Sequence, residues 1–515
     1  MAEATGSATH PSGMHSRRLF WGCWIALIAT SFGFIARVLT ADAWGAEFGL
    51  SQTQVGEILG AGLWPFAVSI ILFSLIIDHL GYKVAMWFGL LCHTLSTVLI
   101  LMADGYTLMY LGTLVLALGS GTVEAYINPV VATVFRKEKT KWLNILHAGW
   151  PGGMVFGGII ILMLLPDIAW RAKIALIVIP TVIYAIMLAR EPFPESERAA
   201  AGVSYRDMLR EVGAVGALII ASMIVFQIGA VFGWPFVVNA LLTLALVGVY
   251  AAYTRSLGKP LFIFLLLIMI PLATTELGVD SWITLLMEDS MQQIGLAAGW
   301  VLIYTSLIMM ILRFNAGPIV HRLNPLGLLS LSAALACLGL ILLSQAGAAV
   351  AILLAATVYG VGKSFFWPTT LGVVAEQFPR GGALTLNGIA GVGMIAVGIV
   401  GAPLMGYIQD VSNSSLLLEQ RPEMAESYLA EHRGLFGRYQ ALDADVVENA
   451  PAEDAAIISA IEDAGKHDAL LKIAILPAFM LLCYLGLLAY FKSKGGYKPV
   501  ALEDERMATR STASV

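Results

Sequence analysis

The chain has 515 residues, of which 58% are hydrophobic and only 13% are charged. Soluble proteins average about 45–50% apolar and about 25% charged residues, so this composition excludes a disordered chain and argues against a soluble enzyme. The net charge of −5 provides no basic surface, so we expect no nucleic-acid partner. The four cysteines show no metal-binding spacing, and the sequence predicts no metal site and no cofactor.

Apolar runs long enough to cross a bilayer follow one another along most of the chain, because about 20 apolar residues span the lipid core. The first run follows two arginines but is longer than the apolar part of a signal peptide, so we expect it to be retained as a helix. Fourteen runs are predicted, near residues 19–40, 53–77, 83–103, 107–135, 143–165, 172–189, 213–232, 234–253, 259–287, 291–320, 325–345, 348–376, 382–407 and 468–491.

The distribution of basic residues predicts the orientation of these helices. If the N-terminus lies in the cytoplasm, 20 of the 30 Lys and Arg residues fall in cytoplasmic segments and 6 fall in outer segments. Cytoplasmic loops carry such an excess, and removing one span would reverse it. We therefore expect fourteen spans in the plasma (inner) membrane with both termini cytoplasmic. Twelve spans, with residues 213–253 as a re-entrant or surface pair, would preserve the same bias.

Residues 408–467 form a long acidic segment on the outer side of the predicted membrane. Sixty residues without a span are unusual for a connecting loop. We expect a solvated acidic loop with some short amphipathic helix, and a small folded cap is the alternative.

An internal repeat divides the chain into two related halves, at offsets of 239 to 243 residues. The repeat predicts an all-α polytopic membrane protein, with one six-helix bundle in residues 1–189 and another in 259–515. Residues 190–258 would supply a cytoplasmic linker and two extra inserted helices. The repeated positions are Gly119, Gly121, Pro129, Phe135 and Leu143-Asn144 in the first half, and Gly360, Gly362, Pro368, Phe378 and Leu386-Asn387 in the second.

Residues 74–83, SLIIDHLGYK, resemble the loop motif GxxxDRxGRR of the major facilitator superfamily. Asp78, Gly81 and Lys83 match the motif, whereas its first glycine and first arginine are replaced. The resemblance implies the major facilitator fold and transport by rocking of the two bundles. It also implies a gating role for the three matching residues, since the family's aspartate holds the cytoplasmic gate shut.

Residues 119–129 and 143–150 are similar to the fucose/glucose permease branch of that superfamily. In that branch a glutamate and an asparagine line the sugar path, and the glutamate takes part in proton coupling. The resemblance assigns these roles to Glu124 and Asn128. The branch also has an Asn-Asp pair in its first helix, where this chain has Ala36-Arg37, so a cation stands beside the place of the carboxylate.

Charged residues inside the runs are the main candidates for a binding site, because burying a charge in a bilayer is costly. Glu124 and Lys363 lie near the middle of corresponding runs in the two halves. We predict that they face each other across a central cavity. Glu124 would exchange a proton or Lys363 would anchor an anion, and a permanent structural ion pair is the alternative.

Further candidates lie around this predicted centre. Glu276 is a possible ligand for a cation or the substrate, and Asp280, on the same helix face, is expected near the outer surface. Arg37 would either join the site or extend to water at the outer end of its helix. Residues suited to sugar hydroxyls and ring faces, with packing as the alternative role of the tryptophans, are Asn128, Asn144, Asn387, Trp150 and Trp367; Asn144 and Asn387 are also candidate gate residues. His147 is a candidate titrating group, with a hydrogen-bonded packing role as the alternative.

The sequence thus predicts a secondary active transporter that moves a sugar or sugar acid by a rocker-switch. A proton is the expected coupling ion, with sodium as the alternative. A small organic anion carrier, favoured by Arg37 and Lys363, a drug exporter and a membrane nutrient sensor are the competing hypotheses. No nucleophile–base or metal constellation indicates an enzyme. The expected partners are the solute, the coupling ion and the lipid bilayer, and we expect a monomer.

Overall fold

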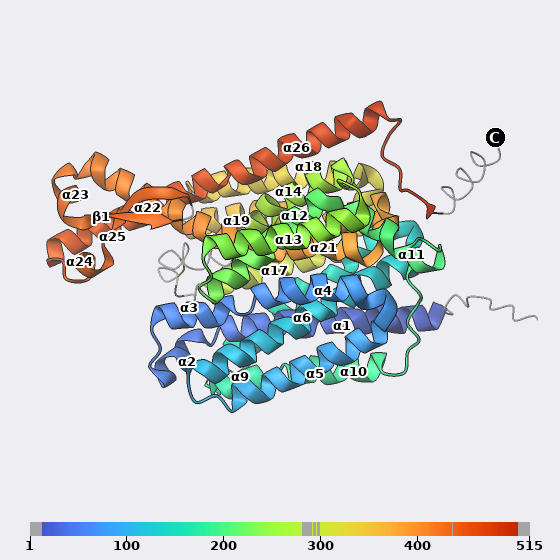
Figure 1. Cartoon of the computed structure of the whole chain (residues 1–515). Coiled ribbons are helices and arrows are strands. Elements are labelled where there is room, and N and C mark those ends of the chain that lie inside the picture. The colour runs from blue at the N-terminus through green and yellow to red at the C-terminus, as the bar shows by residue number, and fades with distance from the viewer. Residues whose placement is uncertain are drawn as a thin grey trace, which may run out of the picture.

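The computed structural model describes residues 13–165, 167–280, 291, 295, 299–434 and 436–502. Within these residues, thirteen helical stretches are long and apolar enough to cross a membrane, and a fourteenth apolar helix has 16 residues. They coincide with the fourteen predicted runs, although parts of 259–287 and 291–320 lie outside the described residues. The predicted helical membrane fold is confirmed, and the long helices run roughly parallel to one another (Figure 1).

The first half contains six spanning segments, several of them interrupted. The second segment breaks between α3 and α4, and the fifth breaks between α7 and α8. The elements are α1 (Gly13–Val38), α2 (Ala41–Phe48), α3 (Gln52–Gly60), α4 (Trp64–Leu80), α5 (Tyr82–Leu101), α6 (Tyr106–Val134), η1 (Arg136–Glu138), α7 (Lys139–His147), α8 (Gly149–Ile159), η2 (Ile160–Leu164), α9 (Trp170–Ala175) and α10 (Val178–Leu188).

The linker and the second half follow the same plan, with an extra pair of helices between them. The linker holds α11 (Glu197–Ala200), and the extra pair is α12 (Tyr205–Val231) and α13 (Phe236–Thr254). The second half comprises α14 (Pro260–Ala273), η3 (Thr274–Gly278), α17 (Gly299–Phe314), α18 (Ala316–Leu343), α19 (Ala349–Lys363), α20 (Phe366–Gln377), η4 (Pro379–Gly381), α21 (Gly382–Ala396), η5 (Val397–Gly401), α22 (Ala402–Gln420), α25 (Ala452–Ile473) and α26 (Ile475–Ser493).

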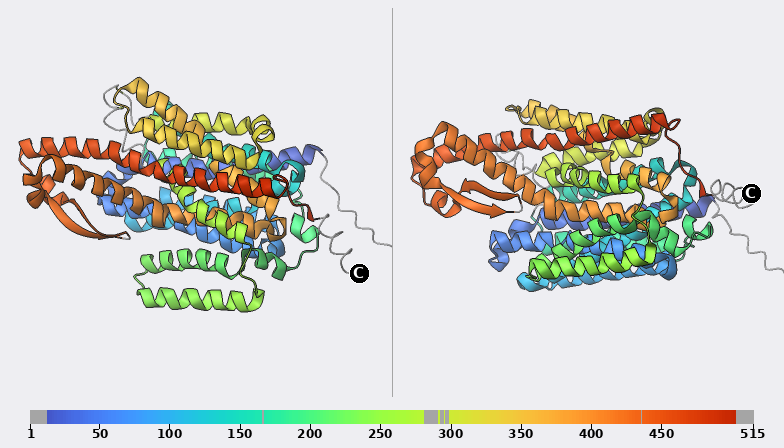
Figure 2. Two further views of the ribbon diagram at one scale, coloured as in Figure 1. Left: turned by 90° about the horizontal axis from the view of Figure 1, so that it is seen from above. Right: turned by 45° about the horizontal axis from the view of Figure 1, so that its top comes forward.

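The inserted pair α12–α13 runs alongside the bundle (Figures 1 and 2). Apart from its contact with α13, helix α12 packs mainly on α21, η4 and α14 of the second half, with fewer contacts to α4 of the first half. Helix α13 packs on α12 and leaves a row of large apolar side chains exposed. This placement is consistent with two inserted spanning helices rather than a re-entrant or surface pair.

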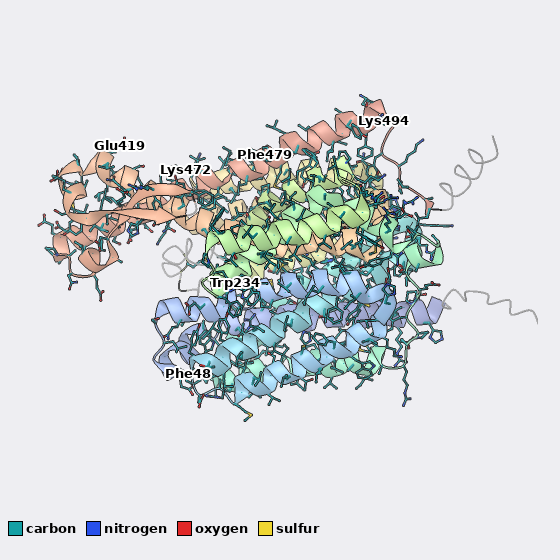
Figure 3. All side chains as sticks on the ribbon, viewed as in Figure 1. Phe48, Trp234, Glu419, Lys472, Phe479 and Lys494 are labelled. Carbon is teal, nitrogen blue, oxygen red and sulfur yellow. The ribbon has the colours of Figure 1, made fainter. Side chains whose placement is uncertain are left out.

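The start of α1 and the end of α26 lie at one end of the bundle, which we call the terminal end, and residues 408–467 lie at the other, which we call the cap end (Figure 1). Figure 3 shows Lys494 at the terminal end, whereas Trp234, in the turn between α12 and α13, and Phe48 lie toward the cap end.

The segment 408–467 is folded, so the expected solvated loop is wrong and the alternative of a cap is correct. Helices α22 and α25 extend beyond the bundle and pack on each other. They are joined by α23 (Pro422–Tyr428), an antiparallel hairpin of β1 (Leu429–Gly434) and β2 (Gly437–Leu442), and α24 (Ala444–Glu448). A small core of Leu417, Tyr428, Ile458 and Ile461, buried from water, stabilises the cap.

The repeated glycines mark close helix contacts. A Cβ atom at Gly121 would lie 2.2 Å from the carbonyl oxygen of Phe66, and one at Gly362 would lie 2.3 Å from the backbone nitrogen of Ala336. Only glycine allows backbones to approach so closely. The repeat therefore includes residues that set how the helices pack.

Candidate functional site

Among the described residues, six Asp, Glu, Lys and Arg side chains of the spanning helices are buried away from the terminal end, and each is at most 8% exposed. Burial of this kind is costly unless the groups are paired or take part in function. They are Arg37 on α1, Glu124 on α6, Glu276 on η3, Asp280 just after η3, Arg313 on α17 and Lys363 on α19.

Lys363 pairs with Asp280, not with Glu124, so the predicted charged pair is wrong. The ammonium group forms an ion pair with the Asp280 carboxylate and lies 3.5 Å from the hydroxyl of Thr305. Asp280 is buried rather than near the outer surface as expected. Pairing within the second half is favoured because η3 and α19 belong to the same bundle, and their groups do not have to meet across the cavity.

Arg313 forms the second buried ion pair and was not selected in the sequence analysis. Its guanidinium lies 2.7 Å from the Glu276 carboxylate and donates to the backbone oxygens of Ser364, at 2.6 Å, and His147, at 2.9 Å. His147 belongs to the first half, so Arg313 links the halves. A single arginine inside an apolar run was the signal in the sequence that could have identified this residue.

Three prolines make backbone oxygens available to this network. Proline has no N–H, so the carbonyl four residues earlier in the helix loses its usual partner. Pro151 thereby leaves the oxygen of His147 for Arg313, as Pro368 leaves that of Ser364. Pro129 likewise leaves the oxygen of Ala125, which accepts a hydrogen bond from the Asn387 amide at 2.9 Å. Pro129 and Pro368 are the repeated prolines, so both halves use the same device.

Glu124 belongs to a network of amides that also crosses between the halves. The Asn128 amide donates to the Glu124 carboxylate at 3.2 Å and to the Asn387 side-chain oxygen at 3.3 Å. The Nε2 atom of His147 lies 3.0 Å from the side-chain oxygen of Asn128. Glu124 and Asn128 are four residues apart on α6, so both project from one helix face. The structure therefore brings together Glu124, Asn128, His147 and Asn387.

A small central cavity lies between these networks. Its lining includes Glu124, His147, Trp150, Glu276, Arg313, Trp367 and Met394. The backbone N–H of Trp367 donates to Glu276 at 3.0 Å, which fixes the start of α20 beside the cavity. Both predicted tryptophans thus reach the cavity, whereas Lys363 is not among the residues that line it.

Arg37 lines an adjoining cavity and is buried, so the expectation that it extends to water at the outer end of its helix is wrong. Its Nε donates to the Gly33 oxygen at 3.1 Å, and its Nη1 has no hydrogen-bond partner. Within the described residues no carboxylate pairs with this guanidinium. Trp150 and Met394 line both this cavity and the central one, so the two spaces are neighbours.

The halves are closed against each other at the terminal end. The Glu376 carboxylate on α20 accepts hydrogen bonds from the hydroxyl and the backbone N–H of Thr140 on α7, at 2.5 and 3.2 Å. Asn144, one turn further along α7, donates to the hydroxyl of Thr369 at 3.2 Å. Of the predicted site residues, Asn144 therefore lies in this closure and not at the central cavity.

The loop motif connects the first half to the linker. Asp78 forms an ion pair with Arg198 on α11, at 2.5 Å, and Lys83 donates to the backbone oxygen of Glu191 at 3.3 Å. Gly81 has a φ of 82°, a conformation that favours glycine, and joins α4 to α5. These contacts hold the linker against the terminal end of the first half, and the gating role stays a prediction.

Comparison with known proteins identifies the family. The sequence model of the Major Facilitator Superfamily matches residues 21–403. The chain belongs to the major facilitator superfamily. Proteins of this superfamily are transporters, so the chain is a membrane transporter and not an enzyme.

Several relatives are known by sequence or structure. A hexuronate transporter of Bacillus subtilis is 24% identical over 139 residues, and the match spans 27% of this chain and 33% of the relative. The Escherichia coli fucose:proton symporter is 16% identical with a TM-score of 0.55, over 91% of this chain and 98% of its own. A human organic anion transporter is 11% identical with a TM-score of 0.60, over 91% and 99%. At these identities the structural matches show a shared fold.

Proposed function

We propose that the protein is a proton-coupled transporter of sugar acids that works by a rocker-switch. The observation that carries this proposal is the buried guanidinium of Arg37, which has no carboxylate partner within the described residues. A cation isolated from water is costly, so its site favours an anion as ligand. A carboxylate is a suitable anion because a guanidinium can donate two parallel hydrogen bonds to it.

The balance of charge around the cavities supports coupling to a proton. Arg313 and Lys363 are paired with Glu276 and Asp280, so Arg37 and Glu124 are the two central charges that form no ion pair within the described part of the chain. With Glu124 ionised, the six charges sum to zero. A proton on Glu124 leaves one net positive charge, which an anionic solute neutralises. Binding of the proton and of the anion therefore favour each other.

The uncharged groups near the cavities suit the rest of a sugar acid. Asn128 and Asn387 carry amides that both donate and accept hydrogen bonds, as hydroxyl groups require. Trp150 and Trp367 line the central cavity and present flat faces for the C–H side of a sugar ring. The name of the Bacillus relative, a hexuronate transporter, supports the same substrate class, and the similarity in fold to a fucose:proton symporter supports coupling to a proton.

We place the terminal end in the cytoplasm, in agreement with the excess of Lys and Arg there. The closed contacts of Thr140 with Glu376 and of Asn144 with Thr369 would then form the inner gate. Residues 1–189 and the bundle that begins at 259 are the two units that rock, and Asp78, Gly81 and Lys83 hold the linker during this movement.

Uptake into proteoliposomes tests the proposal. We expect labelled D-glucuronate to accumulate when the outside is acidic, D-glucose not to accumulate, and a sodium gradient to have no effect. Arg37→Gln should abolish uptake. Glu124→Gln should retain exchange of glucuronate across the membrane but lose accumulation driven by the pH gradient, because the proton carrier is gone. Equal accumulation of glucose, or full pH-driven uptake by Glu124→Gln, would contradict the proposal.

A carrier of small organic anions without hydroxyl groups is the second candidate, and the same unpaired Arg37 favours it. A panel that compares D-glucuronate with propionate and succinate distinguishes the two, because the amides of Asn128 and Asn387 give a preference only for the hydroxylated acid. A nutrient sensor would bind glucuronate without accumulating it.

A further inference from the structure

A second hollow opens at the cap end, and we call it the vestibule. It is lined by Glu57 of α3, Trp64 of α4, Tyr106 and Tyr110 of α6 and Gln227 of α12, with Met394 of α21 on the side of the second half. Both halves and the inserted helix therefore contribute to it.

The aromatic wall of the vestibule is held in a fixed orientation. The rings of Tyr106 and Tyr110 stack with their centres 5.7 Å apart and their planes 29° from parallel. The hydroxyl of Tyr106 donates to the Glu57 carboxylate at 2.7 Å. A pair of rings fixed in this way presents a flat face at little entropic cost, as the apolar face of a sugar ring requires.

Polar groups without partners line the same space. Gln227 is half-buried on a membrane-spanning helix, and its amide has no hydrogen-bond partner among the described residues. Within the same residues, the indole N–H of Trp64 and the hydroxyl of Tyr110 also have no partner. An amide in such a helix is costly unless it faces water or a ligand. These three groups therefore offer donors and an acceptor to a molecule in the vestibule.

The vestibule borders the cavity of Arg37. Leu63 and Met394 line both spaces, and Gly62, next to Leu63, lies against the guanidinium. The vestibule thus has a negative charge, Glu57, at its wall and a positive charge, Arg37, beyond its floor. This arrangement orients an incoming sugar acid with its carboxylate directed toward Arg37.

We infer that the vestibule is a capture site for the pyranose ring of the solute, and that the inserted helix α12 supplies it with Gln227. This inference rests on the proposed function, which identifies the transported solute as a sugar acid, and adds a first binding site for that solute at the cap end. Because the vestibule contacts ring hydroxyls and ring faces, it binds a neutral pyranoside as well as an acidic one. The central site, in contrast, requires the carboxylate.

Saturation-transfer difference NMR on the full-length protein in nanodiscs tests the capture site, with methyl β-D-glucopyranoside as the probe. We expect transfer to the ring protons in the wild type and in Arg37→Gln, and loss of transfer in Gln227→Leu and Tyr110→Leu. Tyr110 lies on a different helix, so its variant decides the question if Gln227→Leu does not fold. Gln345→Leu, at an exposed glutamine just beyond the cap-end terminus of α18, is the matched control and should resemble the wild type.

Glucuronate uptake provides the second readout. Gln227→Leu should raise KM about three- to tenfold, the effect of losing one hydrogen bond, and leave kcat unchanged because the chemistry of coupling lies deeper. Equal NMR signals in the wild type and both vestibule variants, or loss of the signal in Arg37→Gln, would overturn the capture site. Absence of glucuronate uptake in the wild type would refute the proposed function, while the NMR result would still decide the vestibule.

Discussion

Gly62 determines where the guanidinium of Arg37 can lie, and Gly62→Ala tests the role of Arg37 without removing its charge. A Cβ atom at position 62 would lie 2.6 and 2.7 Å from the two terminal nitrogens of Arg37, whereas ordinary contact begins at 3.4 Å. The guanidinium must therefore retreat by about 0.8 Å. The backbone conformation itself is open to alanine, because Gly62 is not among the described glycines with positive φ, and the Cβ atom would also lie 3.0 Å from the backbone oxygen of Leu59.

The size of the effect follows from hydrogen-bond geometry. Bonds between a guanidinium and a carboxylate have lengths of about 2.7–2.9 Å, so a retreat of about 0.8 Å breaks at least one of them. A hydrogen bond to a charged group contributes about 1.5–3 kcal/mol. We therefore expect Gly62→Ala to raise KM for D-glucuronate by at least about tenfold, at 1.4 kcal/mol for each factor of ten.

Proteoliposome uptake measures KM, and a thermal unfolding scan confirms that the variant is folded. Gly56→Ala is the matched control, because Gly56 lies on α3, the short helix that ends just before Gly62, and a Cβ atom there would meet nothing within 4 Å. In an Arg37→Lys background, which removes the colliding nitrogens, Gly62→Ala should cause little further change. A folded Gly62→Ala variant with KM within about twofold of the wild type would refute the assignment of Arg37 as the anion ligand.

Three further variants test other parts of the structure. Glu376→Gln weakens the bonds to α7 that close the terminal end, so cysteines introduced there should react faster with a soluble maleimide; unchanged rates would exclude this role. Asp280→Asn leaves Lys363 buried without its counter-ion, at a cost of about 3–5 kcal/mol, so the unfolding temperature should fall and recover when Lys363→Met is added. Hydrogen bonds from the first two side chains of α9 hold the pKa of Glu47 below its usual value. The resulting stabilisation of α2 is complete above about pH 4.5 and is lost as the pH falls through the lowered pKa. The protection of the α2 amides against hydrogen exchange, relative to the intrinsic exchange rate at each pH, should therefore decrease on acidification in the wild type and show no such decrease in Glu47→Gln.

The spanning helices could be predicted because lipid leaves the backbone few choices. A chain in a bilayer must satisfy its backbone hydrogen bonds internally, so each apolar run of sufficient length becomes a helix. The same constraint explains why the segment 408–467 was misjudged. Outside the lipid that rule does not apply, and the fold of the cap depends on a few apolar contacts, such as that between Leu417 and Ile458, within an acidic composition.

The sequence alone also determined that Glu124, Glu276 and Lys363 are buried in the membrane, since they lie inside apolar runs whatever their partners, but it did not identify Asp280 and Arg313 as buried. Only the tertiary structure decided which of them meet. The rotation and tilt of each helix set its neighbours, and they brought Lys363 to Asp280 and Arg313 to Glu276. These ion pairs neutralise four of the buried charges and leave Arg37 and Glu124 beside the cavities. The sequence could not show this pairing, because the spacing of residues along one helix does not indicate which face of another helix they will contact.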